Sequence, residues 1–117
     1  MKDTVEIAGI EDLLPGTMKK VVVGDHEYLL SRIGDRFYCT DNRCPHLDAD
    51  LSTGFLTGTI LTCPLHHSRF DITDGHVVRW TNLSGHILSM ARQQKPPHAL
   101  KTYPVTVEGG KILVDLS

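Results

Sequence analysis

Apolar residues in this chain gather in short runs of four to six positions that are rich in β-branched and aromatic side chains. Glycine-containing pairs separate several of these runs, at Gly24-Asp25, Gly34-Asp35 and Gly109-Gly110, where tight turns are expected. The pattern predicts strands at residues 5–8, 18–23, 28–33, 37–40, 59–62, 69–72, 76–80, 103–107 and 112–116. Many short strands at this spacing favour an all-β chain, folded as a small antiparallel β-sandwich or barrel.

One stretch, from Thr81 to His98, departs from the strand pattern. Ser84 is suited to cap a helical turn there, which Pro96-Pro97 would end. From Gly75 to Val107 the chain carries basic residues and no acidic one: Arg79, Arg92, Lys95 and Lys101. Two interpretations stay open, a solvated loop that covers a sheet edge and a basic flank that meets an acidic partner.

Length and composition limit the functions available to the chain. Its 117 residues and net charge of −2 predict a single domain, 1–117, with a modest core. No apolar run approaches the roughly 18 residues of a membrane span, and Met1-Lys2-Asp3 opens without a signal-peptide core, so we expect a cytoplasmic protein that binds no membrane. Catalytic carboxylate pairs, phosphate-binding glycine loops, nucleophile motifs and nucleic-acid signatures are not recognisable, so neither an enzyme nor a small-molecule substrate is expected.

Two short segments carry the chemistry, Cys44-Pro45-His46 and Cys63-Pro64-Leu65-His66. Each supplies one thiolate and one imidazole, and together they provide four metal ligands. Such mixed ligation suits a 2Fe-2S cluster in which one iron is bound by two Cys sulfurs and the other iron is bound by two His nitrogens. A tetrahedral zinc site takes the same ligands, although zinc modules usually keep like ligands together. With these two cysteines assigned to metal, Cys39 has no disulfide partner and is expected to be a buried apolar residue.

Over residues 42–75 the chain resembles the soluble Rieske-type ferredoxins, such as the ferredoxin components of ring-hydroxylating dioxygenase systems. The matching motifs are Cys44-Pro45-His46, Leu51-Ser52-Thr53-Gly54, Cys63-Pro64-Leu65-His66, Phe70-Asp71 and Asp74-Gly75. The resemblance implies that Cys44 and Cys63 bind the inner iron of one Rieske 2Fe-2S cluster and that His46 and His66 bind the outer iron. It also implies an antiparallel base with the two ligand loops forming a cluster-binding subdomain, approximately residues 41–75.

The function implied by this resemblance is one-electron transport from a flavin NAD(P)H reductase to a terminal oxygenase or a similar redox partner protein. Two alternatives remain open: the small Rieske-like subunit of an assimilatory, nitrite-type reductase, and a zinc-stapled interaction module. Ala49 and Leu65 stand where high-potential Rieske proteins have a disulfide, and Phe70 replaces a tyrosine hydroxyl donor. We therefore expect a reduction potential that is low compared with those of other Rieske clusters.

The ligand region is mildly acidic, which predicts a docking preference. Between Asp41 and Gly75 two bases, Arg43 and Arg69, are outnumbered by five acids, Asp41, Asp48, Asp50, Asp71 and Asp74. Such a surface would be steered toward a basic site on a partner. His67 stands where the family usually has glycine, and an exposed side chain is expected there.

Overall fold

The computed structural model describes residues 4–45, 48–64, 67–79 and 98–116. Within these ranges nearly all regular structure is β, with two single-turn 3-10 helices, η1 (Ile10–Asp12) and η2 (Leu51–Thr53). The strands are β1 (Thr4–Gly9), β2 (Met18–Val23), β3 (His26–Ile33), β4 (Arg36–Asp41), β5 (Phe55–Thr57), β6 (Ile60–Thr62), β7 (Arg69–Asp71), β8 (Val77–Arg79), β9 (Thr102–Tyr103), β10 (Val105–Glu108) and β11 (Lys111–Asp115).

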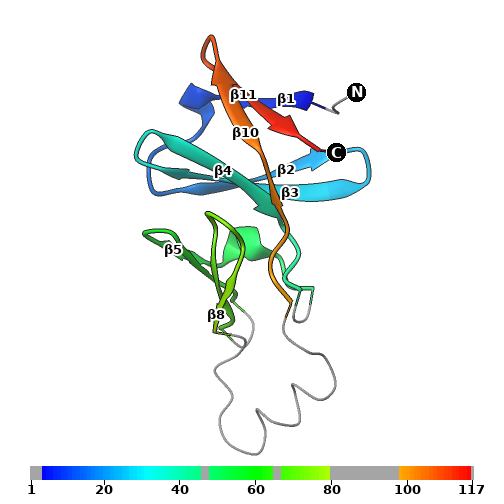
Figure 1. Cartoon of the computed structure of the whole chain (residues 1–117), viewed down its shortest axis with the longest axis vertical. Helices are drawn as coiled ribbons and strands as arrows, with labels where there is room; N and C mark the ends of the chain where they lie inside the picture. Colours follow the sequence, from blue (N-terminus) through cyan, green and yellow to red (C-terminus); the bar gives the residue numbers. More distant parts are fainter. Residues whose placement is uncertain (1–3, 46–47, 65–66, 80–97, 117) are drawn as a thin grey trace, which may run out of the picture.

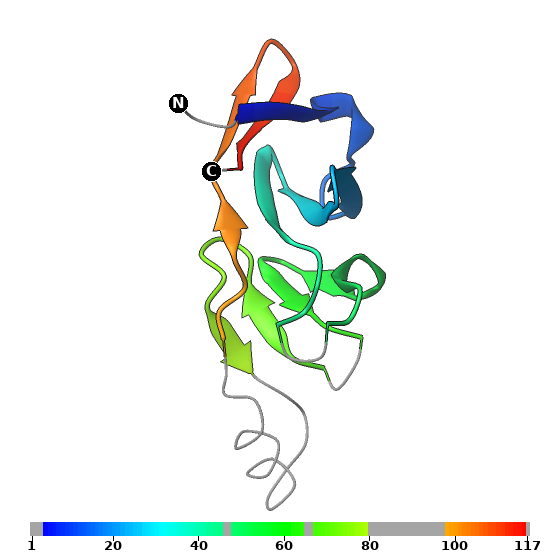
Figure 2. The ribbon, with the colours of Figure 1, turned by 90° about the vertical axis from the view of Figure 1, so that its right-hand side faces the viewer.

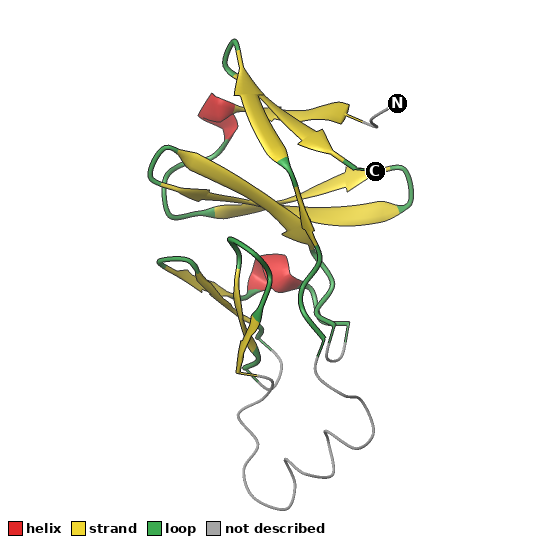
Figure 3. Cartoon of the chain, viewed as in Figure 1, coloured by secondary structure: helices red, strands yellow, loops and turns green. Residues whose placement is uncertain are grey.

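These strands form three antiparallel sheets (Figures 1 and 3). Two sheets, in the orders β1-β11-β10 and β2-β3-β4-β9, build the base of the molecule. The third, β5-β6-β7-β8, lies at the opposite end from the β10–β11 turn. Figure 2 shows the same stacking from the side, with the third sheet below the base.

Two buried clusters fill the space between the sheets. The base core comprises Leu13, Tyr28, Leu30, Cys39, Tyr103, Ile112 and Val114. The loop core comprises Leu29, Cys44, Leu51, Leu61, Cys63, Phe70, Ile72 and Leu100. Adjacent residues of β3 point to opposite faces, so Leu30 enters the base core while Leu29 enters the loop core. This arrangement explains the continuous buried run in β3, which a strand with one solvated face would not show.

The all-β antiparallel fold expected from the sequence is confirmed, with two local corrections. The strand β5, three residues between Gly54 and Gly58, was not predicted from the sequence. The strand expected over 103–107 is instead two strands separated by Pro104, which has no N–H to donate to a ladder. As a result β9 pairs with β4 in one base sheet and β10 pairs with β11 in the other.

The expected turns lie where the glycine pairs predict them. Gly24, Gly34, Gly109 and Gly110 all have positive φ, between 56° and 77°, which glycine adopts without steric cost. Trp80, which ends the strand expected over 76–80, and most of the Thr81–His98 stretch lie outside the described residues. In the part of the chain that the structure describes, no helix is long and apolar enough to cross a membrane.

Candidate metal centre

Each candidate cysteine begins a loop that is closed by a backbone hydrogen bond to the residue five positions later. The backbone N–H of Cys44 donates to Ala49 O at 2.9 Å, and that of Cys63 donates to Ser68 O at 2.7 Å. In both loops the residue before the closing one has a left-handed backbone, φ 60° at Asp48 and 56° at His67. The two loops therefore share one backbone design, a Cys-Pro start and a left-handed residue four positions after the cysteine.

Both cysteines are buried in the loop core. Cys44 is 2% exposed and Cys63 1% exposed, among apolar neighbours that include Leu51, Leu61 and Phe70. A thiolate in such surroundings needs a positive partner, because an isolated buried charge is strongly unfavourable. A neutral assembly of iron, sulfide, two thiolates and two neutral imidazoles meets that requirement, so the donor set fits a Rieske cluster.

The other two predicted ligands, His46 and His66, lie outside the described residues. Among the residues that the structure does describe, no group of three or more metal-ligating side chains comes together. The structure thus places the two cysteines in one core, and the two imidazole ligands stay predictions from the sequence.

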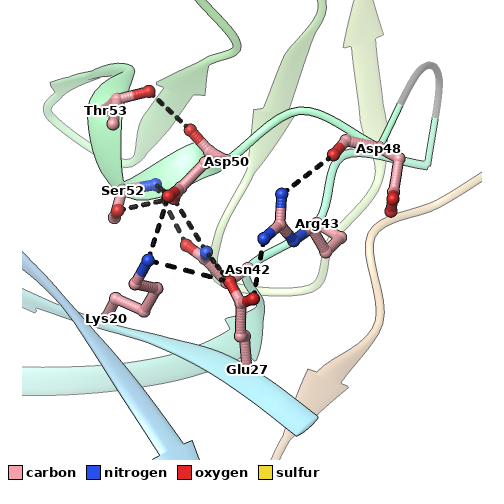
Figure 4. A network of polar contacts seen from close by, with 8 residues as sticks. All are labelled: Lys20, Glu27, Asn42, Arg43, Asp48, Asp50, Ser52 and Thr53. Carbon is pink, nitrogen blue, oxygen red and sulfur yellow. Dashed lines mark hydrogen bonds and ion pairs between the residues drawn. The ribbon is translucent and has the colours of Figure 1, made fainter.

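A buried asparagine anchors the first loop to the base. Asn42 is fully buried, and its Nδ2 donates to Asp50 Oδ1 at 2.8 Å and to Glu27 Oε1 at 2.9 Å (Figure 4). Its Oδ1 accepts from the backbone N–H of Ser52 at 3.0 Å. The backbone of Asn42 also accepts from Leu51 N–H, and donates to the carbonyl of Glu27. Because Asn42 precedes Cys44 by two residues, these bonds fix where the first loop leaves the base.

Charged groups surround this asparagine and are mutually paired (Figure 4). Lys20 Nζ donates to Asp50 Oδ2 at 3.1 Å, and Arg43 Nη2 donates to Glu27 Oε2 at 2.7 Å. The hydroxyl of Ser52 donates to Asp50 at 2.6 Å, and this bond, followed by those from Asn42 and Lys20, holds the pKa of Asp50 far below its usual value. The Arg43 hydrogen bond is the main cause that lowers the pKa of Glu27. Strands β2 and β3 are therefore tied to the first loop through ionised carboxylates.

The second loop is held by a close approach and by an arginine. A Cβ on Gly54 would collide with the carbonyl oxygen of Thr62, so this glycine allows η2 to pass directly against the start of the second loop. Its φ is −84°, so it is this close approach, and not a left-handed backbone, that favours glycine at this position. Arg79 donates through Nη2 and Nε to the carbonyl of His67, at 3.0 and 3.3 Å. His67 is exposed, as expected from its sequence context.

Most of the acids counted in the ligand region have structural partners. Asp41 accepts from the hydroxyl of Tyr103 at 2.6 Å, and Asp71 and Asp74 accept from backbone N–H groups two residues later. Asp50 accepts from Asn42 and Lys20. The exposed Asp48 is then the one of the five acids whose carboxylate forms no hydrogen bond within the described chain. These hydrogen bonds hold the carboxylates in place without removing their charge, and of the five acids only Asp50 is also paired with a lysine or arginine, Lys20, among the described residues.

The third cysteine has a purely structural environment. Cys39 lies on β4 in the base core with 1% exposure. Burial, followed by the nearby Asp41 carboxylate, raises the pKa of this thiol to about 12. A thiol that is inaccessible and protonated is unreactive, so the expectation of a small buried apolar residue is confirmed.

Sequence reasoning missed Asn42, Lys20 and Glu27 as supports of the site. Asn42 opens the stretch that carries the family motifs, but nothing in its local pattern marks a buried side chain. Lys20 contacts an aspartate thirty positions away, a pairing that no spacing rule predicts.

Comparison with known proteins agrees with the two-loop geometry. A family model described as the Rieske [2Fe-2S] domain matches residues 3–104. The chain is 33% identical over 113 residues to the ferredoxin component of the naphthalene 1,2-dioxygenase system of Pseudomonas putida, covering 97% of this chain and 95% of that protein.

Solved structures show the same similarity. The ferredoxin of carbazole 1,9a-dioxygenase from Nocardioides aromaticivorans IC177 superposes with a TM-score of 0.79 at 28% identity, covering 97% of this chain and 98% of that one. A complex of reduced oxygenase and oxidised ferredoxin in carbazole 1,9a-dioxygenase contains a chain with a TM-score of 0.75 and 28% identity, covering 96% of this chain and 92% of that chain. The match over nearly the whole length decides between zinc and iron-sulfur, and the chain belongs to the Rieske 2Fe-2S domain family.

Proposed function

We propose that this chain is a one-electron carrier that receives electrons from a flavin NAD(P)H reductase and delivers them to a terminal oxygenase. The observation that supports it best is the pair of buried cysteines, one from each of two loops that close in the same way. When bound, a Rieske cluster supplies reversible one-electron chemistry. In this proposal Cys44 and Cys63 hold the inner iron, and His46 and His66 hold the outer iron.

The described residues have definite roles in such a carrier. The loop core keeps water away from the two sulfurs, which favours retention of a neutral metal assembly in an apolar site. The hydrogen bonds of Asn42 anchor the first loop, and Gly54 lets η2 lie against the start of the second loop, which helps to position both thiolates. A rigid site lowers the structural reorganisation that accompanies each electron transfer.

The oxygenase is proposed as partner because a similar ferredoxin has been solved in complex with the oxygenase of carbazole 1,9a-dioxygenase. A second support is that relatives are named as ferredoxin components of dioxygenase systems. We also propose that the chain works as a single domain, 1–117, in the cytoplasm, where its buried cysteine thiols would stay reduced.

Metal analysis of purified protein tests this function. We expect about two irons and two acid-labile sulfides per chain, with the visible spectrum of a Rieske cluster. Alanine at any of the four ligand positions, Cys44, His46, Cys63 or His66, should abolish that spectrum. Cys39→Ala is the matched control and should retain it, because Cys39 lies in the other core. One zinc per chain without labile sulfide would contradict the proposal.

A further inference from the structure

A row of solvent-facing side chains crosses the outer face of the third sheet, with Phe55 and Arg69 exposed and Thr62 and Arg79 half-buried. The register pairs Phe55 with Thr62, Thr62 with Arg69, and Arg69 with Arg79. Directly paired residues on neighbouring strands share one face of a sheet. The neighbouring Leu61 and Phe70 are fully buried on the inner face, so the row lies on the solvent side.

This row forms a groove with an unusual composition. The groove has a volume of about 400 Å³ and is lined by Phe55, Thr57, Thr62, His67, Arg69 and Arg79. Phe55 is 60% exposed although it is a large aromatic residue. The described residues that line the groove include two arginines and no acid.

The two arginines are placed at a cost in stability. Like charges directly opposite each other on neighbouring strands repel. Among the described residues neither Arg69 nor Arg79 forms an ion pair with a carboxylate. By contrast, Arg43 at the start of the first loop pairs with Glu27 of β3. Arg79 is oriented by its bonds to the carbonyl of His67, which keeps its guanidinium at the groove. A carboxylate supplied from outside would relieve the repulsion.

The groove also adjoins the second ligand loop. Thr62 directly precedes Cys63, and Arg69 directly follows Ser68, the residue that closes this loop. Arginine and aromatic side chains are the types that contribute most to binding at protein interfaces. A protein docked here would lie against the loop that carries His66.

We propose that the groove at Phe55, Arg69 and Arg79 docks a carboxylate-rich surface patch of a redox partner protein. This inference rests on the proposed function, since it assumes that electrons leave or enter near the second loop. It also refines the expectation of a mildly acidic ligand region, because the described residues that line this groove include Arg69 and Arg79 and no acid. The carboxylates would pair with the guanidinium groups, and an apolar residue of the partner would cover Phe55.

A gold electrode coated with a carboxylate-terminated alkanethiol serves as the probe, with a hydroxyl-terminated coating as blank. Bound mass is measured by surface plasmon resonance, and electron transfer by voltammetry on the same coating, using holoprotein. The variants are Arg69→Glu, Arg69→Gln and the control Lys111→Glu. Lys111 begins β11, a strand that lies at the opposite end of the molecule from β8 (Figure 1). Arg69→Glu and Lys111→Glu change the net charge by the same amount, and Lys111 has a long, exposed ion pair with Glu6 that contributes little.

We expect Arg69→Glu to weaken adsorption by about tenfold and to slow electron transfer on the carboxylate coating, with a smaller loss for Arg69→Gln. Lys111→Glu should change adsorption by less than about twofold, and salt should reduce the differences between variants. Equal losses in Arg69→Glu and Lys111→Glu would overturn the docking surface. A missing voltammetric signal in every protein would refute the carrier function, while the adsorbed mass would still decide whether the groove binds carboxylates.

Discussion

Replacing Asn42 with alanine should destabilise the fold where it supports the first ligand loop. Asn42 is fully buried, and its side chain bonds Asp50, Glu27 and the amide of Ser52. The bond to the Asp50 carboxylate is charge-assisted and contributes about 2 kcal/mol, and the bond from Ser52 about 1 kcal/mol. The bond to Glu27, a carboxylate that Arg43 also pairs with, is left out of this sum. We therefore expect a loss of about 3 kcal/mol in the free energy of unfolding.

The loss should be visible in thermal unfolding. For a domain of this size 1 kcal/mol lowers the Tm by about 4 °C, so Asn42→Ala should lower it by about 10–15 °C. The assay is circular dichroism on holoproteins matched for iron content. Thr53→Ala is a suitable control because it removes one exposed hydrogen bond to the carbonyl of Asp50 and leaves the buried side-chain network intact.

A companion variant separates hydrogen bonding from charge. Asn42→Asp keeps the shape of the side chain but adds a carboxylate beside Asp50 and Glu27, so like-charge repulsion is expected to make it at least as unstable as the alanine variant at neutral pH. Its Tm relative to Asn42→Ala should rise as the pH falls and the added carboxylate is protonated. A Tm change below about 3 °C for Asn42→Ala would refute the idea that this side chain anchors the loop.

Three further outcomes are expected. The folded-state pKa of Asp50 is lowered, so its ionised form stabilises the fold above its unfolded pKa of about 3.9, and this contribution is lost as the pH falls. Asp50→Asn should therefore have a lower Tm than the unchanged protein at pH 7, and its Tm should decrease less than that of the unchanged protein between pH 5 and 3. Gly75→Ala should lower the Tm markedly, because φ is +80° and the new Cβ would collide with the carbonyl oxygen of Leu100; Gly58→Ala, also at positive φ but with open space, is its control. The reduction potential, measured by voltammetry, should lie in the lower half of the Rieske range of about −150 to +300 mV, and a value near the upper limit would contradict the interpretation of Phe70 and Ala49.

The sequence predicts the local elements of this fold well, because strand patterns and turn glycines act over a few residues. The β2–β3 and β3–β4 turns and the burial of Cys39 follow from such local signals. Contacts between distant segments could not be predicted in the same way. Lys20 contacts Asp50 because η2 packs against β2. Pro104 separates β9 from β10, and these two strands belong to different sheets.

The outer groove shows why register matters as much as element type. Arg69 and Arg79 are ten positions apart, and nothing in their spacing indicates that they face each other. They do so because β7 and β8 pair with an irregularity between Arg69 and Phe70, which shifts the register and places one arginine opposite the other. A regular ladder from the Phe70–Val77 pair would instead put Val78 opposite Arg69. A local irregularity in the ladder thus creates the cationic row, and the same strands deliver Phe70 to the core that surrounds Cys44 and Cys63.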